Sequence, residues 1–265
     1  MNNPYDLKIH VEKAGYTHPI VKDCSLDIPQ GKFCCIVGPN GSGKSTFLKS
    51  LLGLLPINEA QVKIGEKPFF DLPLKMRARQ ISFMLQKLEI DFPFSVEELV
   101  SLGRYPHSGL MTELTLSDKE IVTSCLELTG TAHLRERRIN ELSGGEYQRV
   151  LLSKTLVQKT PILLLDEPTA HMDLGHQVQT YELLKKLVVS ENKTVLSVCH
   201  DLNLAAEYAD LIVIITQGSI RLSGSPADTL TKESIEYLSE STCLVVDKNP
   251  FTQNPHIYIR PGRSS

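Results

Sequence analysis

Residues 38–45 of this chain read Gly38-Pro39-Asn40-Gly41-Ser42-Gly43-Lys44-Ser45, which fits the pattern G-x-x-x-x-G-K-[ST]. Before them, Phe33–Val37 is a short, continuous apolar run, as expected of a fully buried strand. After them, residues 46–55 predict a helix that ends near Pro56. A glycine-rich turn in this context points its backbone N–H groups inward, and the positive end of the helix dipole adds to their attraction for anions. We therefore expect this turn to hold the phosphates of a nucleotide.

Three side chains at the end of this turn have expected roles of their own. Lys44 should reach the β and γ phosphates of ATP, and Ser45 should hold Mg²⁺ through its hydroxyl group. Thr46, which opens the predicted helix, is expected to contact the phosphates as well. The alternative is a glycine-rich turn with a chance Lys-Ser pair, but the strand before it and the helix after it supply the context that the motif requires.

A second candidate element is the apolar run 162–165, which is followed by Asp166 and Glu167. Open α/β sheets bind ligands at the carboxyl ends of their strands. We expect Asp166 to hold Mg²⁺ and Glu167 to act as the general base for the attacking water. Taken alone, the two carboxylates could simply open a solvated turn before Pro168. Together with the phosphate-binding turn, they predict a P-loop nucleoside triphosphatase.

Composition and charge exclude several classes of protein. The 265 residues are 41% hydrophobic and 22% charged, which is typical of a globular protein. The net charge of −3 gives no reason to expect a nucleic-acid partner. No secretory signal is visible, and no apolar run approaches the roughly 20 residues that span a bilayer. Six cysteines without a C-x-x-C pair predict buried thiols rather than disulfides or a zinc site: Cys24, Cys34, Cys35, Cys125, Cys199 and Cys243.

Apolar strands alternate with helical patterns along most of the chain, which favours an α/β fold with a mostly parallel sheet. Further predicted strands are 7–11, 81–85, 194–198, 211–216 and 220–222, and further predicted helices are 177–189 and 202–209. The middle of the chain differs, because it is predominantly helical. There we expect one helix with a capping box between Ser117 and Glu120, and a second helix from Ser143 to about 158.

The second of these helices opens with Leu142-Ser143-Gly144-Gly145-Glu146-Tyr147-Gln148-Arg149. Ser143 is a natural N-cap and Glu146 completes a capping box. Two glycines in a first helical turn cost about 1 kcal/mol each, which close approach to a phosphate would justify. The stretch closely resembles the signature motif of ATP-binding cassette (ABC) ATPases. The resemblance implies that Ser143, Gly144 and Gly145 face the γ-phosphate of ATP bound to a second copy of the chain in a head-to-tail dimer.

Four other positions match the ABC family in order. The resemblance implies that Tyr16 stacks on adenine, although a surface tyrosine in a loop is an equal alternative on sequence grounds. It implies that Gln86 contacts Mg²⁺ and the attacking water, and that Asp173 belongs to the loop that communicates across the dimer. His200, at the end of a predicted strand, resembles the histidine that contacts the γ-phosphate and holds Glu167 in place.

The resemblance covers essentially the whole chain and implies one ABC ATPase domain. Residues 1–87 and 159–240 would form the nucleotide-binding core, with an N-terminal antiparallel β piece near Val11 and Ile64. Residues 88–158 would form an inserted helical subdomain that carries the signature motif. Residues 241–265 would form a C-terminal extension with a small hairpin.

Finer features are similar to the ATPases of importers for ferric siderophores, haem and cobalamin. The segments that carry this similarity are 92–107, 169–173, 199–206 and 218–227. In such systems the ATPase lies on the cytoplasmic face of the membrane beneath an integral permease, and it serves a substrate-binding protein indirectly. Phe92, Phe94, Arg104 and Tyr105 would line or adjoin the groove that receives a permease helix. The phenylalanines could equally belong to the core of the helical subdomain.

Two other functions compete with the importer ATPase. One is a soluble ABC ATPase without a transport role, such as a cluster-assembly ATPase, against which the segment 92–107 is the main argument. The other is a module that binds ATP without hydrolysing it. The intact set of Lys44, Asp166, Glu167, Ser143 and His200 argues against the second alternative.

Overall fold

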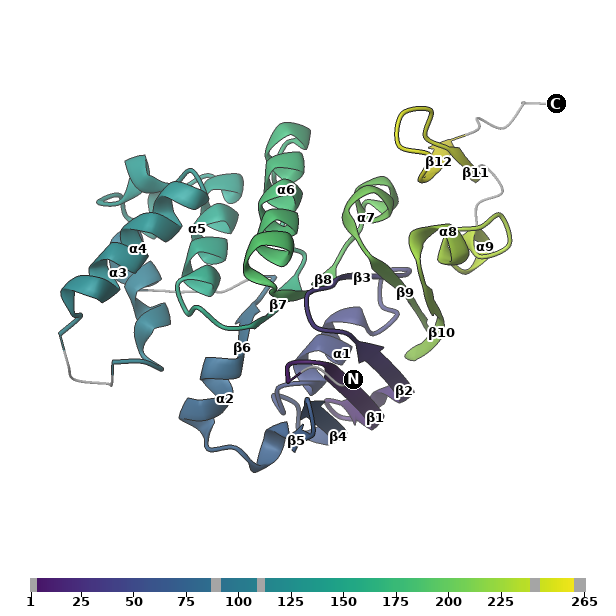
Figure 1. The fold of residues 1–265 in the computed structure, drawn as a ribbon, viewed down its shortest axis with the longest axis horizontal. Coiled ribbons are helices and arrows are strands. Elements are labelled where there is room, and N and C mark those ends of the chain that lie inside the picture. Colours follow the sequence, from purple (N-terminus) through teal and green to yellow (C-terminus); the bar gives the residue numbers. More distant parts are fainter. Residues whose placement is uncertain (1–3, 87–91, 109–112, 239–243, 260–265) are drawn as a thin grey trace. The chain divides into compact units, whose positions relative to one another are not determined.

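The computed structural model describes residues 4–86, 92–108, 113–238 and 244–259 (Figure 1). The chain divides into two compact units, one formed by residues 1–70 and 196–265 and the other by residues 71–195. Each unit is described by itself.

An antiparallel sheet begins the first unit. Its strand order is β2-β1-β4-β5, with β1 (Leu7–Gly15), β2 (Pro19–Ile28), β4 (Ile57–Ile64) and β5 (Lys67–Pro68). The central strand β1 alternates as expected for a sheet with one covered face, because Leu7, Ile9 and Val11 are buried while Lys8 and His10 are partly exposed. This sheet is the predicted N-terminal antiparallel piece.

The strands next to the phosphate-binding turn form a second group in the first unit. The buried strand β3 (Phe33–Val37) pairs parallel with β9 (Leu211–Thr216), which pairs antiparallel with β10 (Ser219–Gly224). Asp210 fixes the start of this pairing, since its backbone N–H donates to the Phe33 carbonyl at 2.7 Å and its carboxylate accepts from the Phe33 N–H at 2.9 Å. Strand β8 (Thr194–Val198) crosses the boundary between the units, and directly after it the Cys199 N–H donates to the Ile36 carbonyl at 3.0 Å. The predicted bounds of β3, β8 and β9 are confirmed to the residue.

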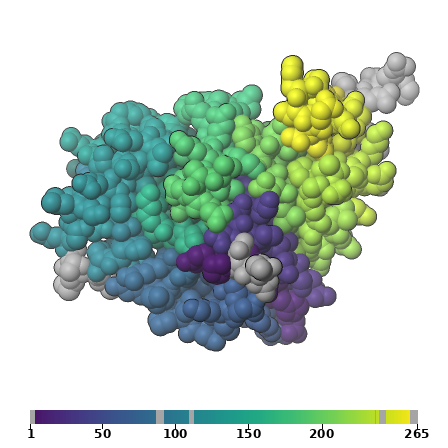
Figure 2. All heavy atoms as spheres, viewed as in Figure 1, coloured from purple at the N-terminus to yellow at the C-terminus, as the bar shows by residue number. Residues whose placement is uncertain are grey.

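Short helices complete the first unit: α1 (Lys44–Ser50), α7 (Leu202–Tyr208), α8 (Pro226–Thr229) and α9 (Ile235–Leu238). The 3₁₀ turn η1 (Phe69–Asp71) ends its N-terminal segment. Near the C-terminus, β11 (Leu244–Lys248) and β12 (Pro255–Ile259) form an antiparallel hairpin. Figure 2 shows this hairpin as a projecting group of yellow atoms beside the yellow-green atoms of the segments that precede it.

The second unit holds a parallel pair of strands and most of the long helices. Strand β6 (Ile81–Met84) pairs in parallel with β7 (Ile162–Asp166). The helices are α2 (Leu74–Gln80), α3 (Val96–Ser101), α4 (Leu116–Leu128), α5 (Gly144–Leu156) and α6 (Leu174–Glu191). Three 3₁₀ turns join them: η2 (Leu102–Arg104), η3 (Ala132–Leu134) and η4 (Ile139–Glu141).

Capping boxes begin three helices of the second unit, and one of them corrects the sequence prediction. Helix α4 is capped by Thr115 and Asp118, not by Ser117 and Glu120. The carboxylate of Asp118 accepts from both the backbone N–H and the hydroxyl of Thr115, so the earlier pair takes the cap. The predicted cap of α5 by Ser143 and Glu146 is confirmed.

The structure confirms an α/β fold with the parallel strand pairs β3–β9 and β6–β7, an N-terminal antiparallel sheet and a helical segment between β6 and β7. Five cysteines lie among the described residues; all five are buried thiols outside any disulfide, as predicted. Cys243 lies outside the described residues. The subdomain boundaries at residues 88, 159 and 241 stay a prediction.

Candidate functional site

The phosphate-binding turn has a backbone conformation that depends on glycine. Gly41 and Gly43 have φ angles of 75° and 101°, in the left-handed region that L side chains rarely adopt. At Gly38 (φ 152°) a Cβ atom would lie 2.1 Å from the Ile215 carbonyl oxygen, so no side chain fits there. Helix α1 begins immediately after Gly43. A glycine-dependent turn that leads directly into a helix start is the backbone arrangement that suits an anion.

Two side chains of this turn carry polar groups suited to phosphate. Lys44 is only 6% exposed, and its ammonium group donates to the carbonyls of Gly38 at 2.9 Å and Pro39 at 2.8 Å. These bonds hold the charge inside the curve of the turn. The hydroxyl of Ser42 is buried and has no hydrogen-bond partner among the described residues. A buried hydroxyl of this kind costs free energy unless something else accepts its hydrogen bond, and a phosphate oxygen would do so.

Tyr16 and His200 also lie in the first unit. The Tyr16 side chain is 45% exposed, and its hydroxyl accepts from the ammonium of Lys49 at 3.1 Å. His200 is exposed and lies between β8 and α7. The next residue, Asp201, caps α7 by accepting from the N–H groups of Asn203 and Leu204 at 2.8 and 3.0 Å. His200 follows the end of strand β8, as predicted.

The two carboxylates of the second unit lie at the end of β7. Asp166 is 1% exposed, whereas Glu167 is partly exposed and has a φ angle of 53°. A left-handed backbone at a residue other than glycine or asparagine is uncommon and is concentrated at functional sites. The amide of Gln86 donates to the Glu167 carboxylate at 2.6 Å, so two of the predicted site residues meet.

Sequence reasoning missed the residue that holds Gln86. The side-chain amide of Gln148, in α5, donates to the Gln86 carbonyl at 2.9 Å and is 3% exposed. Gln148 lies within the signature motif, but its burial follows only from the packing of α5 against β6. Through it, the signature helix is tied to the glutamine that bonds Glu167.

The start of α5 is built as predicted, and the structure adds a reason for its glycines. The carboxylate of Glu146 accepts from the backbone N–H and the hydroxyl of Ser143 at 2.8 and 2.7 Å, and these bonds lower the pKa of Glu146 below its usual value. A Cβ atom on Gly144 would lie 3.1 Å from the Cβ of His171, and one on Gly145 would lie 3.2 Å from the His171 carbonyl. Close packing against the loop after β7 thus favours glycine here, independently of any phosphate.

A hollow of about 510 Å³ lies over this helix start. Its lining includes Ser143, Gly144 and Gly145 from the signature motif, and Asp173 and His176 from the start of α6. Asp173 caps α6 and pairs with the imidazole of His176 at 2.8 Å, and its bonds to His176 hold the pKa of its carboxyl below the usual range. The structure therefore brings Asp173 beside the signature residues. His176 is a second residue that sequence reasoning missed.

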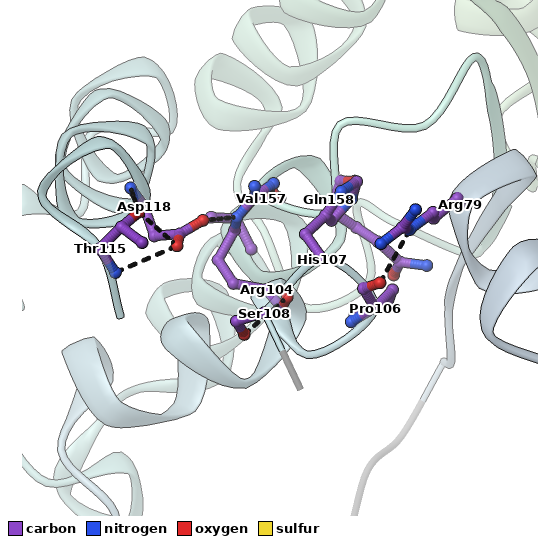
Figure 3. A network of polar contacts seen from close by, with 9 residues as sticks. All are labelled: Arg79, Arg104, Pro106, His107, Ser108, Thr115, Asp118, Val157 and Gln158. Carbon is purple, nitrogen blue, oxygen red and sulfur yellow. Dashed lines mark hydrogen bonds and ion pairs between the residues drawn. The ribbon is translucent and has the colours of Figure 1, made fainter. Parts of the chain in front are cut away.

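Figure 3 shows the surroundings of Arg104 and corrects one expectation about it. The Arg104 side chain is buried, and it donates to Asp118 at 2.8 Å and to the Val157 carbonyl, at the end of α5, at 2.9 Å. A buried Arg104 can adjoin a groove but does not line one, so only the second half of the expectation stays a prediction. The neighbouring His107 bonds the Gln158 carbonyl at 2.8 Å, and Arg79 donates to the Pro106 carbonyl at 2.8 Å.

Two other residues of the segment 92–107, Tyr105 and Phe92, are exposed instead. Tyr105 is 42% exposed and Phe92 is 63% exposed, which argues against a core position for Phe92. The Phe92 and Phe94 rings contact each other with their centres 4.6 Å apart. Exposed aromatic residues on a rigid support are typical of protein interfaces.

Comparison with known proteins identifies the family. The ABC transporter family matches residues 21–170. The ferric enterobactin transport ATP-binding protein FepC of Escherichia coli is 36% identical over 248 residues, which cover 94% of this chain and 91% of that protein. This chain belongs to the ABC transporter family.

Further relatives agree with this membership. The cobalamin import ATP-binding protein BtuD of Halobacterium salinarum is 35% identical over 97% of this chain, which spans 63% of that protein's length. A solved dimeric structure of a bacterial ABC transporter cassette superposes with a TM-score of 0.72 at 29% identity, over 82% of this chain and 98% of that one. As an ABC ATPase, the chain binds ATP and hydrolyses it. In the described part of this ABC chain, no helix is long and apolar enough to cross a membrane.

Proposed function

We propose that this chain is the ATP-hydrolysing subunit of an importer for iron complexes, such as ferric siderophores or haem, or for cobalamin. The observation that carries the proposal is 36% identity to FepC over nearly the full length of both chains. The similarity to BtuD supports the wider class of cargo, and both relatives are named as transport proteins, which favours this function over cluster assembly.

In the proposed reaction, backbone N–H groups of the phosphate-binding turn and of the start of α1, together with the Lys44 ammonium, would hold the phosphates of ATP. Mg²⁺ would be held by the hydroxyl of Ser45, the amide oxygen of Gln86 and the carboxylate of Asp166, which are the kind of oxygen ligands it prefers. When bound, Mg²⁺ would neutralise charge on the β and γ phosphates. Tyr16 would stack on adenine with its exposed ring.

Glu167 is the proposed general base. Its left-handed backbone differs from the extended strand before it, and the 2.6 Å bond from Gln86 fixes one carboxylate oxygen. The carboxylate keeps lone pairs with which to accept a proton from the attacking water. His200 is proposed to contact the γ-phosphate.

The proposed working form is a head-to-tail homodimer. Ser143 caps the 13-residue helix α5, Gly144 and Gly145 begin it, and all three line a hollow. The backbone N–H groups of the two glycines, at the positive end of the helix, would face a γ-phosphate held by a second copy. Asp173 lines the same hollow, and its loop would communicate between the two copies of the dimer.

The proposed permease contact includes Phe92 and Tyr105. The network in Figure 3 anchors the segment that carries Tyr105 to the end of α5, so a partner that pushes on this aromatic surface would also act on the signature helix. We place the protein at the cytoplasmic face of the membrane, where it would serve a substrate-binding protein only through the permease.

Purification of the tagged chain from membranes of its native host tests this proposal. We expect a multispanning protein to co-purify, and we expect less of it with a Phe92→Ala/Tyr105→Ala variant that keeps its ATP affinity. A chain found only in the soluble fraction, with no membrane partner, would contradict the transport role and favour the cluster-assembly alternative.

A further inference from the structure

The short helix α7, which directly follows His200 and Asp201, has two differently occupied faces. Leu204, Ala205 and Ala206 are buried, and α7 contacts β3. Asn203 and Glu207 are four residues apart and therefore lie on one face of the helix. Both of these polar side chains bind the C-terminal hairpin formed by β11 and β12.

Asn203 binds strand β12 through both ends of its side-chain amide. The Ile257 N–H donates to its oxygen at 2.7 Å, and its nitrogen donates to the Ile257 carbonyl at 3.2 Å. The amide thus satisfies both backbone groups of one strand residue, as a neighbouring strand would do. These two hydrogen bonds fix the hairpin in one register against α7.

Glu207 binds the turn of the hairpin. One carboxylate oxygen accepts from the Asn249 amide at 2.7 Å and the Thr252 hydroxyl at 2.8 Å, and the other accepts from the Asn254 amide at 3.0 Å. A carboxylate is the only side chain that accepts at both oxygens and donates at neither. The three donors of the turn are therefore matched to glutamate at this position.

The hairpin matters for α7 because the helix has only seven residues. Isolated helices of this length are unstable in water and depend on tertiary contacts. The Asp201 carboxylate accepts from Asn203 and Leu204, and the Cys199 thiol donates to the Asp201 carbonyl at 3.0 Å. His200 lies between these two anchors, so its backbone follows the position of α7.

We propose that the C-terminal hairpin positions His200 through α7, with Asn203 and Glu207 as positioning residues for ATP hydrolysis. This inference depends on the proposed contact of His200 with the γ-phosphate. The hairpin would thereby affect turnover. Glu207 and Asn203 would act only through the position of His200, since neither belongs to the phosphate-binding turn or to the residues that would hold Mg²⁺.

The test is Glu207→Gln in the full chain. A glutamine places an NH₂ group against the donors of the turn, so at least one of them loses its acceptor. We expect kcat for ATP hydrolysis to fall about fivefold or more, because small displacements of catalytic groups have large effects on rate. KM for ATP and the thermal midpoint should change little. The control is Glu182→Gln, an exposed glutamate on α6, which should match the unmodified protein.

A second substitution distinguishes the loss of this hydrogen bond from a general destabilisation of the protein. In the double variant Glu207→Gln/Asn254→Asp the polarity of one hydrogen bond is reversed, since the new amide donates to the new carboxylate. We expect this variant to recover most of the lost kcat. An unchanged kcat in Glu207→Gln, or a loss that the double variant does not recover, would overturn the inference.

His200→Ala, measured in the same assay, separates the inference from the function on which it rests. Normal turnover in His200→Ala would remove His200 from the reaction. Impaired turnover in His200→Ala together with normal turnover in Glu207→Gln would overturn the role of the hairpin alone.

Discussion

Glu167 has a backbone conformation that residues with a side chain usually avoid, and its carboxylate is held by one amide. A left-handed φ angle at a glutamate costs roughly 1 kcal/mol or more and persists only where neighbouring contacts maintain it. Here the buried strand β7 before it and the bond from Gln86 do so. The conformation and the Gln86 bond together fix the position of the residue that we propose as the general base.

Glu167→Gln tests that role directly. The amide keeps the size of the side chain but cannot accept a proton from water, so we expect kcat to fall by about 10² to 10⁴-fold. ATP binding, measured by equilibrium titration with a fluorescent analogue, should remain. Near-normal hydrolysis in this variant would assign the base to another residue.

Arg104 shows where sequence reasoning about a single residue fails. The resemblance to importer ATPases implies that Arg104 lines or adjoins a surface groove, whereas the structure buries its side chain. Arg104 donates to the Asp118 carboxylate, 14 residues away, and to the Val157 carbonyl, 53 residues away. No local sequence pattern predicts a buried pair of this kind.

Removal of this arginine should destabilise the protein. Arg104→Ala leaves the Asp118 carboxylate buried without its counter-charge, and we expect the free energy of unfolding to fall by about 3 kcal/mol. Urea denaturation followed by circular dichroism measures the change. Lys119→Ala, an exposed position on α4, should change it by less than about 0.5 kcal/mol. An equal effect of both substitutions would mean that the buried pair contributes little.

At the scale of the elements, prediction succeeded where a pattern is local and continuous. Strands β3, β8 and β9 are short segments dominated by apolar and β-branched residues, and their bounds follow from the sequence alone. The start of α4 did not follow, because Thr115-x-x-Asp118 and Ser117-x-x-Glu120 both fit a capping box. The ion pair with Arg104 favours the first of these, and it is a tertiary contact.

The three capping boxes predict how stability depends on pH. Bonds from Ser95, Thr115 and Ser143 lower the pKa values of Glu98, Asp118 and Glu146. A carboxylate whose pKa is lower in the folded state stabilises that state above its ordinary pKa, near 4, and loses the contribution as pH falls through the lowered value. We expect α3, α4 and α5 to lose stability in acid for this reason.

Urea midpoints measured by circular dichroism from about pH 6 to about pH 3 would show this loss. In the variant Glu98→Gln/Asp118→Asn/Glu146→Gln, the midpoint should start lower at pH 6 and vary less with pH. A dependence on pH as steep as that of the unmodified chain would place the titrating groups elsewhere.

At the scale of the whole molecule, the order of short motifs was enough to identify the family, because each motif lies at the end of a strand or the start of a helix. Bonds between distant segments could not be predicted. Gln148 to Gln86 spans 62 residues and Asn203 to Ile257 spans 54, and a polar side chain carries no sign of a partner that far along the chain.

The proposed head-to-tail dimer makes a prediction about mixtures. Lys44→Ala should disable the phosphate-binding turn, and Ser143→Asp should place a negative charge against the partner's phosphate while keeping a good N-cap. Each variant alone should be inactive. A mixed dimer has one site with both parts intact, so an equal mixture should recover up to about a quarter of the unmodified ATPase rate. Activity that stays at zero on mixing would contradict the arrangement.

The rates at which the buried cysteines react with a thiol reagent report on local opening of the chain. Burial raises the pKa of the Cys34 thiol and of the Cys125 thiol, and only the thiolate reacts with alkylating reagents. Cys34 and Cys199 belong to the first unit and Cys125 to the second. Each thiol can therefore be labelled only when its own surroundings open, and mass spectrometry of the labelled peptides would time the opening of each unit separately. Comparison of these times with and without ATP would show which unit the nucleotide closes, in a protein with no introduced probe.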